Sequence, residues 1–446
     1  MYRQVDVPRS FRGMWPVAVV RAGLAPSILT MLACTTLVLG GCAGLTGPGD
    51  SGPPAEITDL PRSLSVGEEA LIGAGNAFGF DLLRELVQSE PDSSHFISPL
   101  SASMALGMTM NGAAGETFDA MRSALRFGGL SQDQINASYR SLLDLLTELD
   151  PAVSVQIANS IWHADWLTPL EAFTARTRSA FDAEVRPIDF FAPDAAPTIN
   201  AWVSEHTRGR IEEMVEDPIP NPEALVMYLL NAVHFEADWT AGFDRADTFD
   251  GPFQLPDGSV ATVRYMERTG GFGMRQAPDY VVVDLPYGGK AFSMTVVVPR
   301  GSLTLPELVA SMDDETWQSL VADLHDADRA GLQLPRFTLE REHGLNEPLA
   351  RMGMGIAFRR CVADFSSAFG REFQEAACPH ISAVKQKTFL RVDEEGTEAA
   401  AVTSVEIVLT SAPPIIRVDR PFLMAIRERL TGTILFLGAI SEAPTD

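Results

Sequence analysis

A stretch near the C-terminus constrains the fold more than any other part of this sequence. Residues 396–412 read GTEAAAVTSVEIVLTSA and contain no aromatic residue, no proline and little charge, whereas surface loops of this length are usually more polar. Side chains of a strand alternate between its two faces. One set, here named the charge-free face, is Thr397, Ala399, Ala401, Thr403, Val405, Ile407 and Leu409, while both glutamates fall in the other set. The stretch is therefore suited to lie as a strand over an apolar core.

The residues around the start of this stretch argue against a permanent place in a sheet. Glu394, Glu395 and Gly396, with the alanines at 399–401, favour neither a stable turn nor a stable strand. Gly396 and the small residues after it would enter a sheet without clashes. A permanent edge or hairpin strand is the alternative interpretation.

The composition is that of a globular protein with a large core, since 46% of the 446 residues are hydrophobic and 21% are charged. The formal net charge of −25 argues against nucleic-acid binding, because a phosphate backbone requires a basic surface. It favours solubility and basic partners. From residue 65 onward the sequence contains no linker, repeat or low-complexity tract, which predicts one large domain.

The first 42 residues have the pattern of an export signal. Four arginines and one aspartate precede an apolar run from Ala22 to Leu39, and small residues follow. The run is short for a membrane span, which needs about 20 residues. The sequence at 39–42 (LGGC) resembles the lipobox of bacterial lipoproteins, which implies that Cys42 becomes the lipidated first residue of the mature chain. Cleavage at an ordinary signal site nearby is the alternative, and both predict an exported protein.

Residues 43–64 are rich in glycine, proline, serine and acidic residues, which predicts a flexible tether. The predicted organisation is a signal peptide at 1–42, a tether at 43–64 and a folded body at 65–446. With a lipid on Cys42, the protein would be membrane-anchored through that lipid only, in the periplasm or at the cell surface. Without it, the protein would be extracellular.

The body contains two cysteines, Cys361 and Cys378. Because an exported protein lies where disulfides persist, a Cys361–Cys378 disulfide is one expectation. Two buried free thiols are the other.

Hydrophobic patterns predict helices in the first third of the body and strands later. Helical periodicity covers residues 76–88, 101–110, 117–125 and 137–149. Apolar, β-branched runs predict strands at 153–162, 280–285, 292–298, 332–339, 388–392, 415–418, 422–426 and 434–440. Helices followed by strands indicate an α+β domain.

Motifs of known enzymes are missing from the sequence. It contains no GxSxG, HExxH, CxxC or Walker motif, and its seven histidines form no ligand cluster. We therefore expect no catalytic activity, no metal and no cofactor. An exported hydrolase with an unrecognised site is kept as a rival hypothesis.

Six segments, which occur in the order found in the family, resemble the serpins, a family of protease inhibitors. They are residues 95–121 (HFISPLSASMALGMTMNGAAGETFDAM), 231–239 (NAVHFEADW), 334–340 with 349–354, 363–366 (ADFS), 392–401 (VDEEGTEAAA) and 419–440. Together they extend over nearly the whole body. The resemblance implies the serpin fold, in which helices pack on large mixed and antiparallel sheets and a reactive-centre loop is exposed.

The resemblance also implies roles for residues of the loop. The hinge of the loop is Glu395, Gly396, Thr397, Glu398, Ala399, Ala400 and Ala401. Spacing from Gly396 to Pro421 implies that a protease cuts the Thr410–Ser411 bond. Threonine at the cut suits elastase-like or subtilisin-like proteases. If the register is shifted by one residue, Leu409 precedes the cut and chymotrypsin-like targets are favoured.

Further positions match parts of the serpin body. Ser98, Ser101 and Asn231 match the shutter, a polar cluster under the sheet that helps it to open. Many relatives have a histidine where this chain has Gln386, although an amide can also donate and accept hydrogen bonds. Trp239 matches the breach, where the loop first enters the sheet. Purely structural interpretations are a helix cap for Ser98 and a core position for Trp239.

The function implied by the resemblance is inhibition by trapping. A serine protease, or a cysteine protease, cuts the loop, which then inserts as a β-strand and drags the attached enzyme along. The partner is the target protease, and we expect a monomer. A non-inhibitory serpin-fold binding protein is the alternative.

Overall fold

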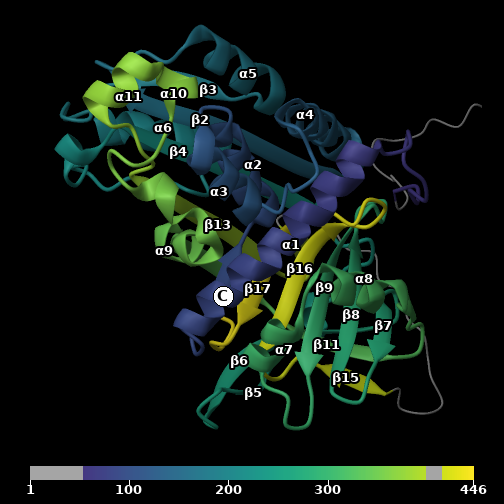
Figure 1. The fold of residues 1–446 in the computed structure, drawn as a ribbon. Coiled ribbons are helices and arrows are strands. Elements are labelled where there is room, and N and C mark those ends of the chain that lie inside the picture. The colour runs from purple at the N-terminus through teal and green to yellow at the C-terminus, as the bar shows by residue number, and fades with distance from the viewer. Residues whose placement is uncertain (1–53, 398–413, 446) are drawn as a thin grey trace, which may run out of the picture. The chain divides into compact units, whose positions relative to one another are not determined.

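Three β-sheets and the helices around them make up residues 54–397 and 414–445, the part of the chain described by this computed structural model (Figure 1). The loop sheet, named for the loop that follows it, has the order β12-β13-β4-β2-β3, and β14 pairs with β4. Its strands are β2 (Val153–Ala164), β3 (Glu184–Ile188), β4 (Met227–Asp238), β12 (Phe337–Gly344), β13 (Ala383–Val392) and β14 (Gly396–Thr397).

The second sheet forms the centre of the core, with the order β1-β17-β16-β9-β8-β7-β10. Its strands are β1 (His95–Ile97), β7 (Gly273–Gln276), β8 (Tyr280–Tyr287), β9 (Phe292–Pro299), β10 (His325–Asp326), β16 (Phe422–Glu428) and β17 (Ile434–Ile440). Every residue of β9, β16 and β17 is buried. Both faces of these strands are therefore covered, which explains their nearly continuous apolar sequences.

A smaller sheet has the order β15-β11-β6-β5. Its strands are β5 (Phe249–Gln254), β6 (Val260–Thr269), β11 (Gly331–Pro335) and β15 (Ile415–Arg417). Because β15 lies directly after residues 398–413, this sheet holds the far end of the loop. Its pairing with β11 is parallel and runs from Gly331↔Ile415 to Gln333↔Arg417.

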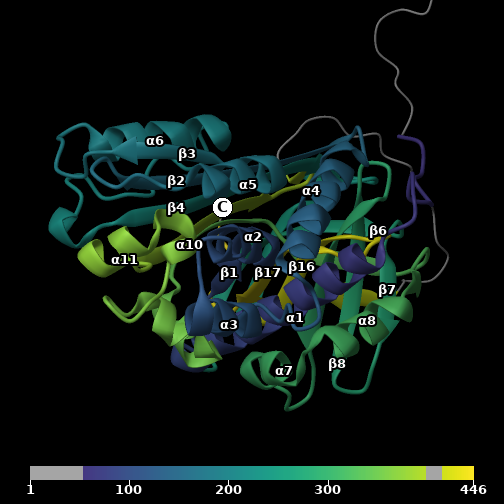
Figure 2. The ribbon, with the colours of Figure 1, turned by 45° about the horizontal axis from the view of Figure 1, so that its top comes forward.

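Helices cover both faces of the loop sheet. Figure 2 shows α6 on one side of β2 and β4, and α2 on the other. The helices are α1 (Val66–Ser89), α2 (Pro99–Met110), α3 (Gly115–Ala124), α4 (Gln132–Glu148), α5 (Glu171–Phe181), α6 (Ala195–His206), α7 (Leu305–Ser311), α8 (Asp314–Ala322), α9 (Asn346–Leu349), α10 (Ser366–Phe369) and α11 (Arg371–Ala377). Short helical turns lie at Pro222–Ala224, Arg245–Asp247, Ala350–Met354 and Gly355–Phe358.

The predicted α+β class is confirmed, and the predicted helices and strands are present with shifted ends. The helix predicted at 76–88 begins ten residues earlier, since Ser65 and Glu68 form a capping box ahead of α1. The strand predicted at 332–339 is wrong as one element. The chain leaves the small sheet at Arg336, so that β11 and β12 belong to different sheets.

The tether predicted at 43–64 is too long at its C-terminal end. Ile57 donates its backbone N–H to the carbonyl of Gly289 at 2.8 Å, and Glu56 pairs with Lys290 at 2.8 Å. Ile57, Leu60 and Leu64 also pack against the core. The folded body therefore includes residues 54–64, and the rest of the predicted tether and the export signal lie outside the described residues.

Candidate functional site

The loop sheet is open along the seam between β4 and β13. The two strands pair only at Ala383↔Tyr228 and Val384↔Leu229, at the end where both begin. Beyond these pairs, no strand among the described residues pairs with the seam edge of β4 from 230 to 236. On their outer edges, β4 pairs with β2 from 227 to 237 and β13 pairs with β12 from 385 to 392. The seam therefore offers two facing strand edges to a further strand.

A tight turn brings the chain from β13 back into this seam. The Asp393 carboxylate accepts hydrogen bonds from the N–H groups of Glu395 (3.0 Å) and Gly396 (3.3 Å), and the Asp393 N–H donates to the Gly396 carbonyl at 3.0 Å. Aspartate favours such turns because its side chain can bond to backbone two residues on. The expectation that residues 394–396 favour no stable turn is therefore wrong, since it left out Asp393.

The first two residues after the turn are seated in the seam as β14. Gly396 and Thr397 pair antiparallel with β4, opposite Asp238 and Ala237. A Cβ atom at Gly396 would lie 2.3 Å from the Ala237 carbonyl oxygen, so only glycine fits this close approach. Thr397 is buried, and its hydroxyl lies 2.9 Å from the Tyr287 hydroxyl. The structure thus holds the start of the loop in the position of an inserted strand.

Trp239 lies directly beside the turn. Its indole N–H donates to the Asp393 carbonyl at 2.9 Å, and its backbone N–H donates to the Glu395 carbonyl at 2.9 Å. Its ring stacks on Tyr287 at 4.4 Å between centroids. Burial raises the pKa of Tyr287, so this tyrosine stays a neutral hydrogen-bonding group under Thr397. Trp239 is a core residue, and it also contacts the turn that leads into β14.

Two glutamates of the turn differ in their surroundings. Glu394 has a side chain only 2% exposed, accepts a hydrogen bond from Thr248 at 2.7 Å and pairs with Arg336 at 3.3 Å. Burial opposes its charge, but the hydrogen bond and the nearby arginines outweigh burial and lower its pKa. Glu395 pairs with Arg245 at 2.7 Å, and that arginine is 64% exposed. The first glutamate therefore anchors the turn, while the second makes a surface contact.

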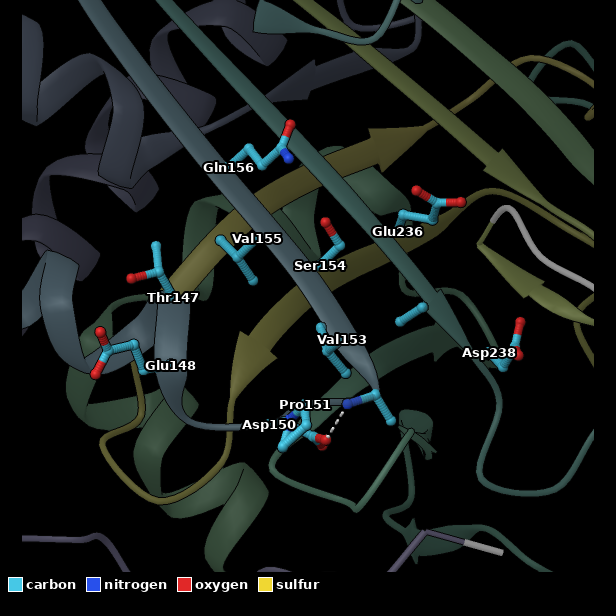
Figure 3. A pocket seen from close by; sticks show the side chains of 12 residues that line it. Thr147, Glu148, Asp150, Pro151, Val153, Ser154, Val155, Gln156, Glu236 and Asp238 are labelled. Atoms are coloured by element: carbon cyan, nitrogen blue, oxygen red, sulfur yellow. Dashed lines mark hydrogen bonds between the residues drawn. The ribbon is translucent and has the colours of Figure 1, made fainter. Parts of the chain in front are cut away.

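A pocket of about 700 Å³ adjoins the seated hinge, on the β2 side of β4 (Figure 3). Glu148 and Asp150 line it where α4 leads into β2, and Glu236 and Asp238 line it from β4. Burial and the charges of Glu395, Glu236 and Asp393 raise the pKa of Asp238. Seating the hinge therefore brings like charges together.

A polar cluster at the start of α2 lies under β13. The Gln386 amide accepts a hydrogen bond from the Ser98 N–H and donates to the Ser98 carbonyl, both at 3.0 Å. Its nitrogen is also 3.5 Å from the Ser101 hydroxyl. The Ser98 hydroxyl accepts from the Ser101 N–H as a helix cap and donates to the Leu435 carbonyl at 2.6 Å. Gln386 thus connects β13 to the start of α2, and Ser98 connects the start of α2 to β17.

Two histidines flank this cluster, His95, which is buried, and His343, which is half-buried. His343 is opposite Gln386 in the β12–β13 ladder, and its ring lies 5.4 Å from the ring of His95. Burial, with the nearby His95 and Arg341, lowers the pKa of His343 to about 4. Burial also lowers the pKa of His95. Both rings are therefore neutral at neutral pH, and these two histidines add no charge beside the cluster of Gln386 and Ser98.

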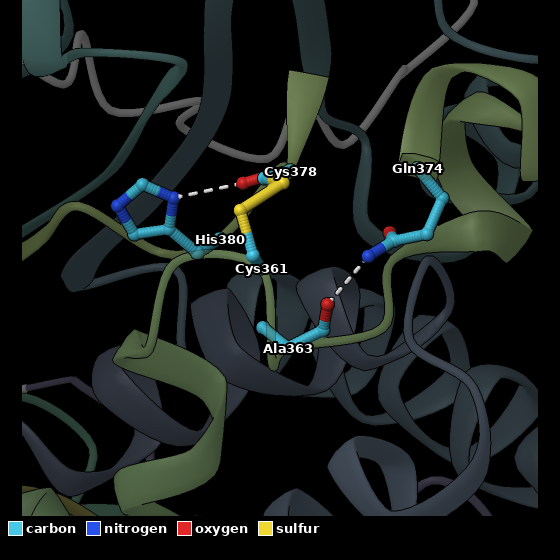
Figure 4. Close-up of a disulfide and its surroundings, with 5 residues drawn as sticks. All are labelled: Cys361, Ala363, Gln374, Cys378 and His380. Atoms are coloured by element: carbon cyan, nitrogen blue, oxygen red, sulfur yellow. Dashed lines mark hydrogen bonds between the residues drawn. A yellow bond between two sulfur atoms is a disulfide. The ribbon is translucent and has the colours of Figure 1, made fainter. Parts of the chain in front are cut away.

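Cys361 and Cys378 are joined by a disulfide (Figure 4). It lies five residues before β13 begins, and the His380 ring is hydrogen-bonded to the Cys378 carbonyl at 3.1 Å. Gln374 of α11 donates to the Ala363 carbonyl within the same loop. The pairing is one of the two arrangements that the sequence allowed, and it holds together the segment that leads into β13.

The remaining predicted site residues fall where the structure gives no side chain. Asn231 lies in β4 opposite Asn159, but its side chain is not described. Cys42, the hinge residues 398–401 and the Thr410–Ser411 bond lie outside the described residues. The shutter role of Asn231 and the position of the cut remain predictions.

Sequence reasoning missed several residues that hold the hinge. Tyr287, Thr248 and Arg336 come from distant parts of the chain and carry no local signal. Asp393 had one, because an aspartate three residues before a glycine is a typical turn pattern. Within residues 54–397 and 414–445, no group of three or more acidic, histidine or cysteine side chains is placed to hold a metal ion. No helix in the same ranges is both long and apolar enough to cross a membrane.

Comparison with known proteins assigns the family. A family model described as Serpin (serine protease inhibitor) matches residues 73–443. The chain belongs to the serpin family. An uncharacterized serpin-like protein of Thermococcus kodakarensis is 30% identical over 430 residues, which cover 92% of this chain and 97% of the relative. The leukocyte elastase inhibitor of Bos taurus is 33% identical over 393 residues, which cover 84% of this chain and all of the relative.

Solved serpin structures share the fold. The thermophilic serpin tengpin in its native state aligns with a TM-score of 0.76 and 27% identity, covering 87% of this chain and 97% of tengpin. Human thyroxine-binding globulin complexed with its hormone aligns with a TM-score of 0.76 and 27% identity, covering 85% of this chain and all of that protein. The predicted serpin fold is confirmed.

The different surroundings of the two glutamates give a stability prediction for this serpin. Glu394→Ala should lower the free energy of unfolding by about 1–3 kcal/mol, since Thr248 and Arg336 lose a buried partner. The matched control Glu395→Ala removes an exposed ion pair and should cost less than about 1 kcal/mol. Chemical denaturation of both variants measures the difference, and equal losses would contradict the anchoring role of Glu394.

Proposed function

We propose that this serpin inhibits serine proteases by inserting its cut loop into the seam between β4 and β13. The observation that carries the proposal is the antiparallel pairing of Gly396 and Thr397 with β4, which supports one direction and one register of entry. Inhibition with a cut at Thr410–Ser411 is the mechanism that the seam, the hinge and the loop sequence support best.

The pairing of β14 with β4 is antiparallel. If it continues, each next residue of the loop lies opposite the residue one position earlier in β4. Ala399 then faces Phe235, and Ala401 faces Val233; both β4 residues are buried. Side chains directly opposite each other in a sheet lie on the same face. The charge-free face, assigned from the sequence, therefore meets the core, and the loop glutamates fall on the other face. The alternation of loop residues in the sequence and the pairing of β14 with β4 therefore support the same orientation of the inserted strand.

Insertion breaks little of the sheet that already exists. Only the pairs at Tyr228 and Leu229 join β4 to β13, and these must separate for Val405 and Glu406 to enter. In return, the new strand gains ladder hydrogen bonds on both of its edges and buries its apolar side chains. The state with the loop outside is therefore expected to be metastable.

Trapping then depends on timing. The protease hydroxyl attacks the Thr410 carbonyl carbon, the bond to the Ser411 nitrogen breaks, and the protease is left as an ester on Thr410. Water releases it only while the oxyanion hole and the triad keep their geometry. Insertion of residues 398 to about 409 pulls on the ester and distorts the protease before water acts. A hinge of small residues enters quickly, which favours trapping.

Elastase-like or subtilisin-like enzymes are the proposed targets. Thr410 presents a small β-branched side chain to the primary pocket of the protease, and the bovine relative is named as a leukocyte elastase inhibitor. With the register shifted by one residue, Leu409 would favour chymotrypsin-like targets. A binding protein without inhibitory activity is the second candidate, favoured by the likeness to thyroxine-binding globulin.

The test is incubation with pancreatic elastase, subtilisin and chymotrypsin, followed by a denaturing gel. An inhibitor gives a covalent band at the summed mass of both proteins. Mass spectrometry of the peptide released from the C-terminal side identifies the cut bond. If every protease only cleaves the loop and stays active, the inhibitory proposal fails and the binding protein is favoured.

The parity argument predicts that Thr397→Arg turns the inhibitor into a substrate. The guanidinium would be buried without a partner against Ala237, which costs several kcal/mol, so insertion slows and hydrolysis wins. The matched control Glu398→Arg places the same group one residue later, on the opposite face, and should keep most of the inhibition. The ratio of cleaved to complexed serpin on a gel is the measurement, and equal ratios for both variants would contradict the register.

Cleavage of the loop should raise thermal stability sharply. The inserted strand buries Val405, Ile407 and Leu409, at roughly 1.5–3 kcal/mol each, and adds ladder hydrogen bonds. Thermolysin is a suitable reagent, because a zinc protease forms no acyl intermediate that could be trapped. Calorimetry compares intact and cleaved protein, and equal melting temperatures would favour the binding protein.

We also propose that the protein is exported and anchored through a lipid on Cys42. Cys42→Ser should release a soluble protein that still inhibits, because the seam, the hinge and the loop all lie in the folded body. Acyl chains act through apolar burial, about 0.8 kcal/mol per methylene, and take no part in the chemistry of the loop. Cell fractionation checks the location, and inhibition is assayed on purified proteins. Wild-type protein in the soluble fraction would contradict the anchor.

A further inference from the structure

Two histidine rings from different sheets lie beside each other in the body. His95 belongs to β1 of the second sheet, and His343 belongs to β12 of the loop sheet. Their ring centroids are 5.4 Å apart, with an angle of 33° between the ring planes. His95 is 3% exposed, and His343 is half-buried. We name these two residues the histidine pair.

Each ring has one nitrogen that makes a hydrogen bond and one that makes none. The Nε2 atom of His95 lies 2.9 Å from the Glu90 carbonyl oxygen, and the ring of His343 is hydrogen-bonded to the backbone of Phe96. Because a carbonyl only accepts, these bonds fix the proton of each neutral ring and leave the other nitrogen as an acceptor. Nδ1 of His95 and Nε2 of His343 are both buried and have no hydrogen-bond partner among the described residues.

This arrangement is typical of histidines that bind a metal. Such a histidine usually donates its second ring N–H to a carbonyl or a carboxylate, which fixes the tautomer and the orientation of the ring. Metals bind the neutral ring, and burial keeps both rings of the histidine pair neutral. A buried acceptor without a partner is costly, and the pair has two of them on neighbouring rings. One ion between the rings would satisfy both nitrogens.

The distance between the rings separates a metal ion from a bridging water. A zinc ion at about 2.05 Å from a ring nitrogen lies about 3.2 Å from the ring centroid, so a tetrahedral angle sets two centroids about 5.2 Å apart. A water that donates to both nitrogens at about 2.8 Å would set the centroids about 6.2 Å apart. The observed separation of 5.4 Å is closer to the metal arrangement.

The charges around the histidine pair are balanced. Burial lowers the pKa of His95, while the negative charges of Glu90 and Glu442 oppose that shift and favour a cation. Arg341 is the nearby cation, and its charge is paired with Glu442. No group of three or more acidic, histidine or cysteine side chains is placed to hold an ion within residues 54–397 and 414–445. Water would therefore complete the coordination.

We propose that the histidine pair binds one divalent transition-metal ion through Nδ1 of His95 and Nε2 of His343. Imidazole suits zinc, copper and nickel, whereas magnesium and calcium require oxygen ligands. The ion joins β1 to β12 and so holds the two sheets together, at the position where His343 lies opposite Gln386. The site does not depend on protease inhibition. The sequence predicted no metal, because the two histidines are far apart in the chain.

Nitrogen NMR of protein labelled in its histidine rings tests the site. Metal-free protein is titrated with zinc chloride, and the ion can enter from the side of the half-buried His343. Zinc should shift the resonances of Nδ1 of His95 and Nε2 of His343 at one ion per protein, and magnesium chloride should shift neither. If zinc leaves both resonances in place, a water fills the gap and the proposal is overturned, even where zinc binds elsewhere on the protein.

The variants His95→Gln and His343→Gln test the two ligands by titration calorimetry. Each should weaken zinc binding by at least about tenfold, since even the loss of a group that only orients a ligand costs about 10–100-fold. The matched control His325→Gln removes an exposed histidine and should keep the affinity. Zinc should raise the melting temperature of the wild type and of this control only. Equal affinities for all four proteins would overturn the proposal, and the NMR result decides alone if a variant does not fold.

Discussion

The seam between β4 and β13, which the described strands fill only at its two ends, is the constraint on which the rest of the structure depends. Backbone N–H and C=O groups in a protein interior are nearly always paired, and among the described residues no strand pairs with the seam edge of β4 from 230 to 236. The fold keeps this edge open by pairing the two strands at one end only and by filling the other end with two loop residues. A loop strand inserted between β4 and β13, as proposed, would pair with the edges of both strands.

The two ends of the seam are held by different chemistry. At the hinge end, carboxylates surround the chain reversal, and burial together with the charges of Glu395, Glu236 and Asp393 raises the pKa of Asp238. At the other end, Gln386 bonds to Ser98 and ties β13 to α2, and Lys385 of β13 pairs with Glu216 and Glu342. If the loop inserts as proposed, the movement would start at the hinge end, and the bonds between Gln386 and Ser98 would oppose the movement of β13 away from α2.

The class of fold and the strand-forming pattern of the loop could be predicted from the sequence, because both follow from local periodicity. The seating of Thr397 on Tyr287 could not, since those residues are far apart in the chain and meet only in the folded sheet. The choice between a disulfide and two thiols at Cys361 and Cys378 likewise required their positions in space. The contact of Ile57 with Gly289 was missed because composition alone, rich in proline and glycine, predicted a tether.

The loop face that carries its two glutamates meets an acidic residue of β4. In the proposed register, Glu398 comes opposite Glu236. Two carboxylates side by side in a sheet would oppose insertion. Arg208 already pairs with Glu236 at 2.5 Å and also reaches Ser154, so one cation lies at this position before the loop arrives. Arg391, near the end of β13, supplies a second cation at the same end of the seam. In the proposed register, the first charged residue of the loop would therefore enter beside two arginines that already pair with Glu236 and Asp393, and these arginines offset part of the repulsion between the carboxylates.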